Sequence, residues 1–188
     1  INAFVVGNVV KNNWDCGIET LGFIIDSHIV SNTSKNSGYC GIGGWYWNSW
    51  KGNIVSDNII ESAPTLFNFF RTYSLRATRT EDGGKLTIPA EEQVHFSNNL
   101  FEKNHLVNPK PVSLFTESSR FLFDTQNLPK EISSQKVLLG NNRFVGNDFT
   151  TTMEVPLLAP SSMIVDGGGN ICGKSPDPNY PLACGRGQ

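Results

Sequence analysis

The chain has 188 residues and a nearly balanced charge, with 15 lysine and arginine residues against 17 aspartate and glutamate residues. The formal net charge of −2 excludes a general attraction to polyanions, so we expect no nucleic-acid partner. No stretch approaches the roughly 20 apolar residues of a membrane-spanning helix, so we expect no membrane span either. The length predicts one elongated domain over residues 1–188, expected to be part of a longer or processed chain because neither a leader sequence nor a methionine precedes Ile1.

Short apolar runs, each followed by a polar turn that usually contains Asn, recur along the chain. The runs are rich in β-branched and aromatic residues and are bounded by turn-formers, so they indicate strands rather than helices. In chain order they are residues 4–6, 23–25, 54–55, 94–96, 137–139 and 163–165. The turns after or beside them are led by Asn8, His28, Asn58, Asn99, Asn142 and Asn170, each with an apolar residue two positions later.

This recurrence predicts the coils of a β-solenoid. One coil cannot cover its own apolar interior, so coils must stack and pair each strand with its equivalents above and below. Asn suits the corners because its side chain tolerates left-handed backbone and bonds to nearby amides, and stacked Asn side chains can form a ladder. The alternative is an antiparallel β-sandwich, which also has short strands and Gly/Asn turns, but the repeated Asn-led dyad favours the solenoid.

The cysteines provide a second signal. There are four of them, at Cys16, Cys40, Cys172 and Cys184. They form no C-x-x-C pair and the histidines lack zinc-finger spacing, so we expect no metal site of this kind. The even count indicates two disulfides in an oxidising compartment, with four buried free thiols in an intracellular protein as the alternative. The tripeptide Cys-Gly-Ile begins at both Cys16 and Cys40, which predicts that these two residues are stacked neighbours, bonded or in contact.

Together these residues resemble the right-handed parallel β-helix repeats of the pectin-lyase-like superfamily, which combine Asn-rich turns, apolar dyads and Gly-Ile strand starts. The resemblance covers roughly residues 1–62, 94–106 and 136–172. It implies an all-β, right-handed parallel β-helix (solenoid) with inserted loops. The ending is similar to the C-terminal edge of secreted members, which implies that Cys172 and Cys184 close the stack.

Two segments depart from the repeat. Residues 64–93 are expected to form a loop-rich excursion, and the proline-rich residues 173–188 a C-terminal capping tail. The excursion contains three arginines, at Arg71, Arg76 and Arg79. Their guanidinium groups would suit carboxylated or sulfated sugars. The alternative is a solvated excursion whose arginines are balanced by nearby carboxylates.

Aromatic residues gather near the second Cys-Gly-Ile tripeptide. The cluster consists of Trp45, Tyr46, Trp47 and Trp50, with Trp14 expected on the preceding coil. Flat rings beside glycines and short polar residues suit stacking on sugar faces, so this cluster is the predicted ligand-binding face. The alternative is that Trp45 and Trp47 point to one side of a strand and fill the core.

The candidate catalytic residues are weaker. They are Glu19, Asp26, His28 and Asp57, accompanied by Asp15 and Glu61. If these carboxylates lined one face, they could bind Ca²⁺ or supply acid and base groups for glycan chemistry, although no motif matches a specific lyase or hydrolase. Strand alternation places Glu19 on the outside. The alternative is that these side chains are solvent-exposed and have no specific function.

The sequence leaves two functional classes open. The first is a secreted or cell-surface β-helix module with a structural, adhesive or glycan-binding role. Its expected partners are a polysaccharide or glycan, or other protein subunits that meet the ends of the coil stack. The second is a carbohydrate-active enzyme, a polysaccharide lyase or glycoside hydrolase, acting on an acidic polysaccharide.

Overall fold

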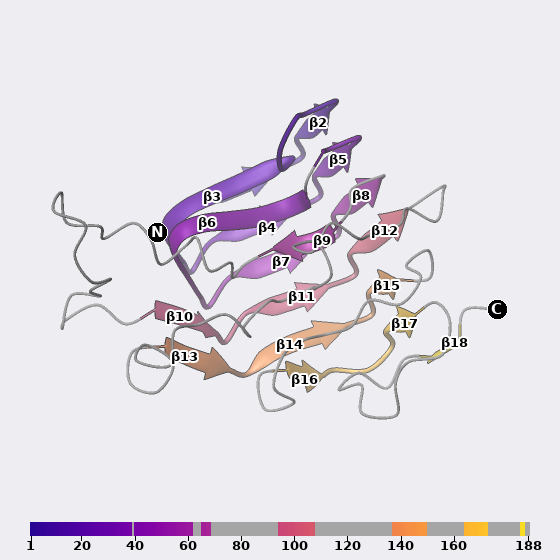
Figure 1. The fold of residues 1–188 in the computed structure, drawn as a ribbon. Coiled ribbons are helices and arrows are strands. Elements are labelled where there is room, and N and C mark those ends of the chain that lie inside the picture. The colour runs from indigo at the N-terminus through magenta and orange to yellow at the C-terminus, as the bar shows by residue number, and fades with distance from the viewer. Residues whose placement is uncertain are drawn as a thin grey trace, which may run out of the picture.

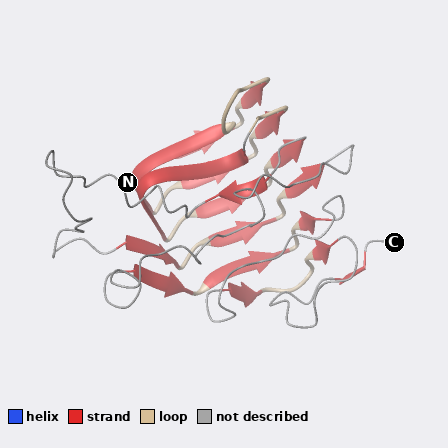
Figure 2. Ribbon diagram, viewed as in Figure 1, coloured by secondary structure: helices blue, strands red, loops and turns tan. Residues whose placement is uncertain are grey.

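The computed structural model describes residues 1–38, 40–61, 65–68, 94–107, 137–149, 164–172 and 185–186. All of the regular structure in these residues is β-strand, and they contain no helix (Figure 2). The described part of the chain likewise contains no helix that is long and apolar enough to cross a membrane.

The strands form three sheets, here called A, B and C. Sheet A has the spatial order β1 (Phe4–Val6), β4 (His28–Val30), β7 (Ile54–Ser56), β11 (Leu100–Glu102), β14 (Asn142–Val145), β16 (Ile164–Asp166). Sheet B has the order β2 (Val9–Lys11), β5 (Thr33–Lys35), β8 (Ile59–Glu61), β12 (His105–Val107), β15 (Asp148–Phe149), β17 (Ile171–Cys172), β18 (Gly185–Arg186). Sheet C has the order β3 (Ile18–Ile25), β6 (Cys40–Lys51), β10 (Val94–Ser97), β13 (Val137–Gly140), and β9 (Thr65–Asn68) also pairs with β6.

From β1 to β15 the described strands follow the order A, B, C, with both β9 and β10 in sheet C. Every strand pair in the described residues is parallel. The first coil is residues 1–25 with β1, β2 and β3, and the second is residues 26–51 with β4, β5 and β6. Figure 1 shows later coils stacked on these, down to β16 and β17. Parallel strands stacked in sheets are consistent with a β-solenoid and exclude the antiparallel sandwich for this part of the chain.

The interior side of sheet A is a column of apolar side chains. Ile29, Val55 and Phe101 lie at paired positions on β4, β7 and β11, and Phe144 continues the column on β14. All four are at most 1% exposed. The rings of Phe101 and Phe144 stack with centroids 4.7 Å apart and planes at 18°. Because alternate residues point to opposite faces, the residues on either side of each column member face outward.

Polar side chains, mostly Asn, occupy two corners of the coils, and the series of turns expected from the sequence mixes them: Asn8, Asn58 and Asn170 lie at one corner and Asn99 and Asn142 at the other. The corner between sheets A and B holds Asn8, Asn32, Asn58, Asn104, Asn147 and Asn170, joined from coil to coil by hydrogen bonds of 2.9 to 3.0 Å. The corner between sheets C and A holds Ser27, Asn53, Asn99 and Asn142. His28 is therefore the first residue of β4, and the corner residue is its neighbour Ser27.

The residue before each of these corner side chains has a left-handed backbone conformation. At the corner between sheets A and B these residues are Gly7, Ser31, Asp57, Lys103, Gly146 and Gly169, all with positive φ. A positive φ is also found before the other corner, at Asp26, Gly52, Asn98 and Asn141. Left-handed backbone favours Gly, Asn and Asp. Asp26 and Asp57 therefore have a structural reason to be where they are.

The Cys-Gly-Ile tripeptides lie at equivalent positions on consecutive coils. Ile18 pairs with Ile42, which places the backbone of Cys16 level with that of Cys40. Cys16 is buried and its sulfur is in a disulfide. The identity of its partner stays a prediction, as does the closure of the C-terminal end by Cys172 and Cys184.

The longest strand, β6, carries the aromatic stretch on a bulge. Its pairing with β3 joins Leu21 to Trp45 and Phe23 to Ser49, so β6 has two more residues than β3 between these points. Bulges re-aim side chains and are frequent beside functional sites. The predicted excursion begins as strand β9, and residues 69–93 with Arg71, Arg76 and Arg79 lie outside the described residues.

Candidate functional site

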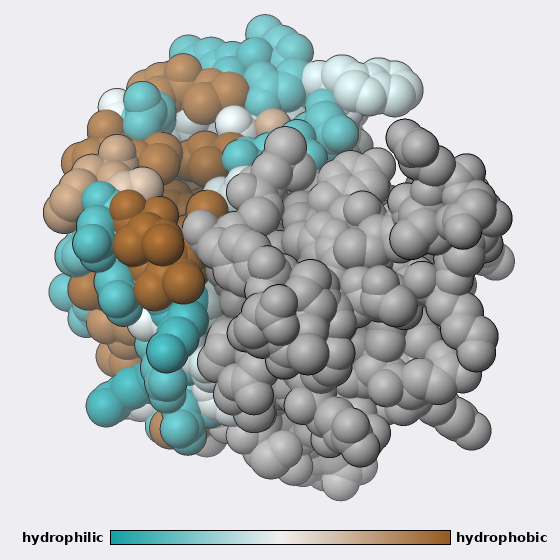
Figure 3. All heavy atoms as spheres, turned by 90° about the vertical axis from the view of Figure 1, so that its left-hand side faces the viewer, coloured by the Kyte–Doolittle hydropathy of each residue, from teal (hydrophilic) through white to brown (hydrophobic). Residues whose placement is uncertain are grey.

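The outer face of sheet A is a lateral surface built from six strands. One outward row consists of Phe4, His28, Ile54, Leu100, Arg143 and Val165. A second row consists of Val6, Val30, Ser56, Glu102 and Val145. Figure 3 shows hydrophobic residues gathered on the described surface, with hydrophilic residues between and around them. The N-terminal half of the two rows is mainly apolar, whereas charged groups appear from β11 onward.

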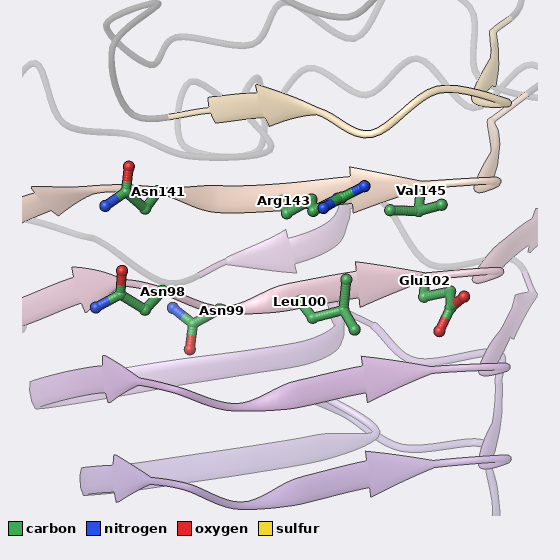
Figure 4. A pocket seen from close by; sticks show the side chains of 7 residues that line it. All are labelled: Asn98, Asn99, Leu100, Glu102, Asn141, Arg143 and Val145. Atoms are coloured by element: carbon green, nitrogen blue, oxygen red, sulfur yellow. The ribbon is translucent and has the colours of Figure 1, made fainter.

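An open groove of about 500 Å³ lies on this face across β11 and β14. It is lined by Asn98, Asn99, Leu100, Glu102, Asn141, Arg143 and Val145. Figure 4 shows their side chains in two parallel lines: Asn98 and Asn141 at one end, Leu100 and Arg143 next, Glu102 and Val145 beyond. The register agrees, because Leu100 pairs with Arg143 and Glu102 with Val145.

The groove combines an apolar floor with polar groups of different kinds. Asn98 and Asn141 are exposed corner residues, so each brings an amide that can donate and accept hydrogen bonds. Glu102 is partly exposed and lies 3.6 Å from the Nζ of Lys103, a long contact that leaves its carboxylate available. Arg143 is exposed and has no carboxylate partner among the described residues.

Gly167 helps to position Arg143. A β-carbon at Gly167 would collide with the side chain of Val145 and crowd Nε of Arg143. The absence of a side chain at Gly167 therefore lets the arginine lie along the strands beside Val145, as Figure 4 shows. The Gly-rich stretch near the C-terminus consequently has a packing role next to the groove.

A second polar feature lies on β3 in sheet C. Glu19 is exposed, in agreement with the alternation expected on this strand. Partial burial by the surrounding protein, and in addition the nearby Asp15 carboxylate, raise the pKa of Glu19 above its ordinary value of 4.5. A carboxyl with a raised pKa beside a second carboxyl is the arrangement that an acid catalyst of glycoside cleavage uses.

The other candidate catalytic residues do not converge. Asp26 and Asp57 lie at different corners, and Glu61 lies on sheet B, where its carboxylate is 2.7 Å from Nζ of Lys35. His28 stacks on the ring of Phe4 with centroids 4.9 Å apart, on the outer face of sheet A. Within the described ranges, no group of three or more His, Cys, Asp or Glu residues is arranged to hold a metal ion.

The aromatic prediction is partly corrected. Trp50 was expected on the binding face, but it is fully buried and its indole Nε1 donates a 3.1 Å hydrogen bond to Oγ1 of Thr20. Its backbone pairs with Ile24 on β3 and with Phe96 on β10, so Trp50 lies between two neighbouring strands of sheet C. Trp14 is 93% exposed. The side chains of Trp45, Tyr46 and Trp47 lie outside the described residues.

Sequence reasoning did not identify two contacts that join residues far apart in the chain. Arg143 is followed by Phe144, and the buried phenylalanine implies an outward arginine, but its alignment with Leu100 depends on the stacking register. His105 and Asp148 pair in the same way on sheet B, with Nδ1 2.9 Å from Oδ2. In both cases the coil between the partners contains a long insertion, which conceals the register.

Comparisons with protein-family models, with curated proteins and with solved structures find no match to this chain.

Proposed function

We propose that this chain is a secreted, non-catalytic β-helix module that binds a carboxylated glycan in the groove on sheet A. The pectin-lyase-like resemblance and right-handed winding are part of this proposal, the latter because crossovers between parallel strands are nearly always right-handed. The observation that carries the proposal is the groove itself, which is lined by amide groups, by apolar side chains and by Arg143, an arginine without a carboxylate partner among the described residues.

The six lining groups other than the buried Asn99 each suit one part of a uronate-containing sugar. The Arg143 guanidinium can form paired, charge-assisted hydrogen bonds with a carboxylate. The Asn98 and Asn141 amides and the Glu102 carboxylate suit hydroxyl groups, which both donate and accept hydrogen bonds. Leu100 and Val145 offer apolar area to the face of a ring. A groove on a lateral surface also accommodates a chain longer than one sugar.

The aromatic stretch remains a second candidate surface for the same ligand class. Trp45, Tyr46 and Trp47 belong to the β6 bulge in sheet C, whereas the groove belongs to sheet A. Trp50 is removed from this surface by its burial. We therefore assign the primary glycan contacts to the groove. Trp14 and the aromatic residues of β6 are additional candidate contacts, to be tested separately.

The binding prediction concerns Arg143→Gln. Loss of a charge-assisted hydrogen bond costs about 1.5–3 kcal/mol, which corresponds to a loss of affinity of about tenfold or more. A glycan array identifies the ligand, and calorimetry with a carboxylated oligosaccharide and its neutral counterpart measures the effect. Lys51→Gln, which removes a positive charge from sheet C, is the matched control and should bind normally. Equal binding by wild type and Arg143→Gln would contradict the proposal.

An enzyme is the second candidate, and the raised pKa of Glu19 beside Asp15 is the observation that favours it. Ultraviolet detection of unsaturated uronate products tests for a lyase, and a reducing-end assay tests for a hydrolase. If turnover occurs and Glu19→Gln abolishes it while Asp57→Asn does not, the chain is an enzyme with its acid on sheet C. Binding of the glycan without turnover would support the non-catalytic binding module.

A further inference from the structure

We infer that Asn32 accepts an N-linked oligosaccharide in the unfolded chain alone, and that this modification and the coil stack exclude each other. The acceptor sequence is Asn32-Thr33-Ser34, which is the one Asn-x-Ser/Thr sequence in the 188 residues. The inference goes beyond the glycan groove and uses from the proposed function only that the chain is secreted. Its test works with purified components, so the result does not depend on what the groove binds.

The acceptor sequence arises where one corner departs from the repeat. Internal rungs such as Asn58 and Asn104 are followed two positions later by an apolar residue. Asn32 is followed instead by Ser34, which is buried. A β-carbon on Gly17 of the preceding coil would overlap the Ser34 side chain, so this part of the stack requires a small residue. Packing therefore explains the serine, and the acceptor sequence is its consequence.

Both amide hydrogens of Asn32 are used in the folded chain. Nδ2 donates to the carbonyl of Val5 at 2.8 Å and to Oδ1 of Asn58 at 3.0 Å. Oδ1 accepts the backbone N–H and the Nδ2 of Asn8, at 2.9 Å each. The side chain is thus held by the coils on both sides, and Asn32 is 2% exposed. A glycosyltransferase has no access to this nitrogen in the folded chain.

The hydroxyl of the acceptor sequence is hidden together with the amide. Alternate residues of a strand share a face, so Asn32 and Ser34 both face the interior, whereas the partly exposed Thr33 faces outward. Ser34 is 2% exposed, and its Oγ lies 2.8 Å from Oγ of Ser37. The spacing that defines the acceptor sequence therefore removes both of its functional groups from solvent when β5 joins the stack.

Attachment of a sugar would remove one of the hydrogens that hold the ladder. Nδ2 attacks C1 of the first sugar of a lipid-pyrophosphate-linked oligosaccharide: the N–C1 bond forms, the bond from C1 to the pyrophosphate oxygen breaks, and Nδ2 loses one proton. The sugar then lies where the carbonyl of Val5 or Oδ1 of Asn58 lies, 2.8 or 3.0 Å from the nitrogen. A carbon bonded to Nδ2 has no room there, and the buried acceptor loses its donor. A glycosylated Asn32 therefore separates the second coil from a neighbour.

The order of folding and modification consequently decides the state of the chain. An unfolded chain presents Asn32 and Ser34 to the transferase, and stacking of the second coil between its neighbours withdraws both. Rapid stacking keeps the side-chain amide for the ladder. Delayed stacking lets the transferase act first, so the oligosaccharide marks the chains in which the second coil has not stacked.

The first experiment uses a purified oligosaccharyltransferase with its lipid-linked donor. Its substrates are the folded 188-residue chain and a synthetic peptide of residues 26–37. The peptide should be modified at Asn32 about 100-fold faster or more, because the folded chain reacts only through its open fraction. Trp14→Thr is the matched control, since it turns residues 12–14 into a second acceptor sequence whose Asn12 is exposed. The folded variant should be modified at Asn12 and not at Asn32.

The second experiment dilutes the chain from denaturant into the same mixture, so that modification competes with folding. A lectin column separates the products, and limited proteolysis compares them. The glycosylated product should be digested about tenfold faster or more than the unmodified chain, because it cannot complete the stack. Ser34→Ala removes the acceptor sequence but keeps Asn32, and it should give no glycosylated product.

Four results would overturn the inference. They are modification of Asn32 in the folded chain at the rate of the peptide, no modification of the peptide, no modification of the diluted chain, and a glycosylated product as resistant to protease as the unmodified chain.

Discussion

Individual Asn residues at the coil corners use the full hydrogen-bonding capacity of a side-chain amide. Asn58 accepts two hydrogen bonds at Oδ1 and donates two from Nδ2, and it is 1% exposed. The amide thus joins three consecutive coils. Buried polar groups in such networks are costly to leave unsatisfied. The stability of the stack should therefore change strongly when single atoms of the Asn58 side chain are replaced.

Asn58→Asp tests this dependence with almost no change of shape. The new carboxylate oxygen would face two acceptors, Oδ1 of Asn104 and the carbonyl of Ile29, so the variant should lose about 3 kcal/mol or more of unfolding free energy. Asn58→Ala should lose less, about 1–3 kcal/mol, because it adds no charge. Denaturant unfolding measures both. Lys51→Ala, an exposed change, should stay within about 0.5 kcal/mol. Normal stability of Asn58→Asp would exclude a buried ladder.

Glu19 makes the stability of the chain depend on pH. Its pKa is raised in the folded chain, so the folded state holds this proton more tightly than the unfolded state. The stabilisation is complete below the ordinary value of 4.5 and is lost as the pH rises through the raised pKa. Glu19→Gln should therefore be more stable than wild type at neutral pH and equal to it in acid.

Thermal unfolding across this pH range measures the difference between Glu19→Gln and wild type. Asp15→Asn is the companion variant, since removal of the second carboxylate should lower the pKa of Glu19, as carboxyl NMR titration would show. A Glu19→Gln variant that is destabilised equally at all pH values would indicate a hydrogen-bonding role instead of an electrostatic one.

At the scale of strands, the Cys-Gly-Ile tripeptides show why glycine begins this part of each coil. A β-carbon on Gly17 would overlap the side chain of Ser34, and one on Gly41 would overlap Ile60. Both partners belong to sheet B of the following coil, so the chain at the start of sheet C lies directly against the next coil. The repeated glycine is thus a consequence of close packing between consecutive coils.

Gly41→Ala should lose about 1–3 kcal/mol, the usual cost of overpacking a filled core. Ile60 is fully buried and is the residue that would have to yield. The double variant Gly41→Ala with Ile60→Val should recover part of the loss, and a double-mutant cycle from denaturant unfolding measures this coupling. Additive losses would mean that the two residues do not share the same space.

At the scale of the whole molecule, the parallel stacking was predictable because its signals are local. An Asn after a left-handed residue and the repeated Cys-Gly-Ile both appear as short patterns in the sequence. The two separate ladders were not distinguished, because their corners lie five positions apart, as Asn99 and Asn104 do. A sequence pattern that takes one Asn per coil mixes the two corners.

The candidate site was less predictable than the fold. The groove depends on Leu100 lying beside Arg143, a pairing across a long insertion. The burial of Trp50 likewise depends on its pairing with Ile24 and Phe96, whereas the adjacent Lys51 and Gly52 indicate only that the strand ends. Register between coils decides both features, and composition carries no information about it.

The stacking of the Asn corners can be observed directly by NMR of the selectively Asn-labelled chain. We predict slowly exchanging side-chain amides whose nuclear Overhauser contacts connect Asn8, Asn32, Asn58, Asn104, Asn147 and Asn170 in that order. Rapidly exchanging amides at the four internal positions, or contacts that link these residues in another order, would contradict the parallel coil stack on which the groove depends.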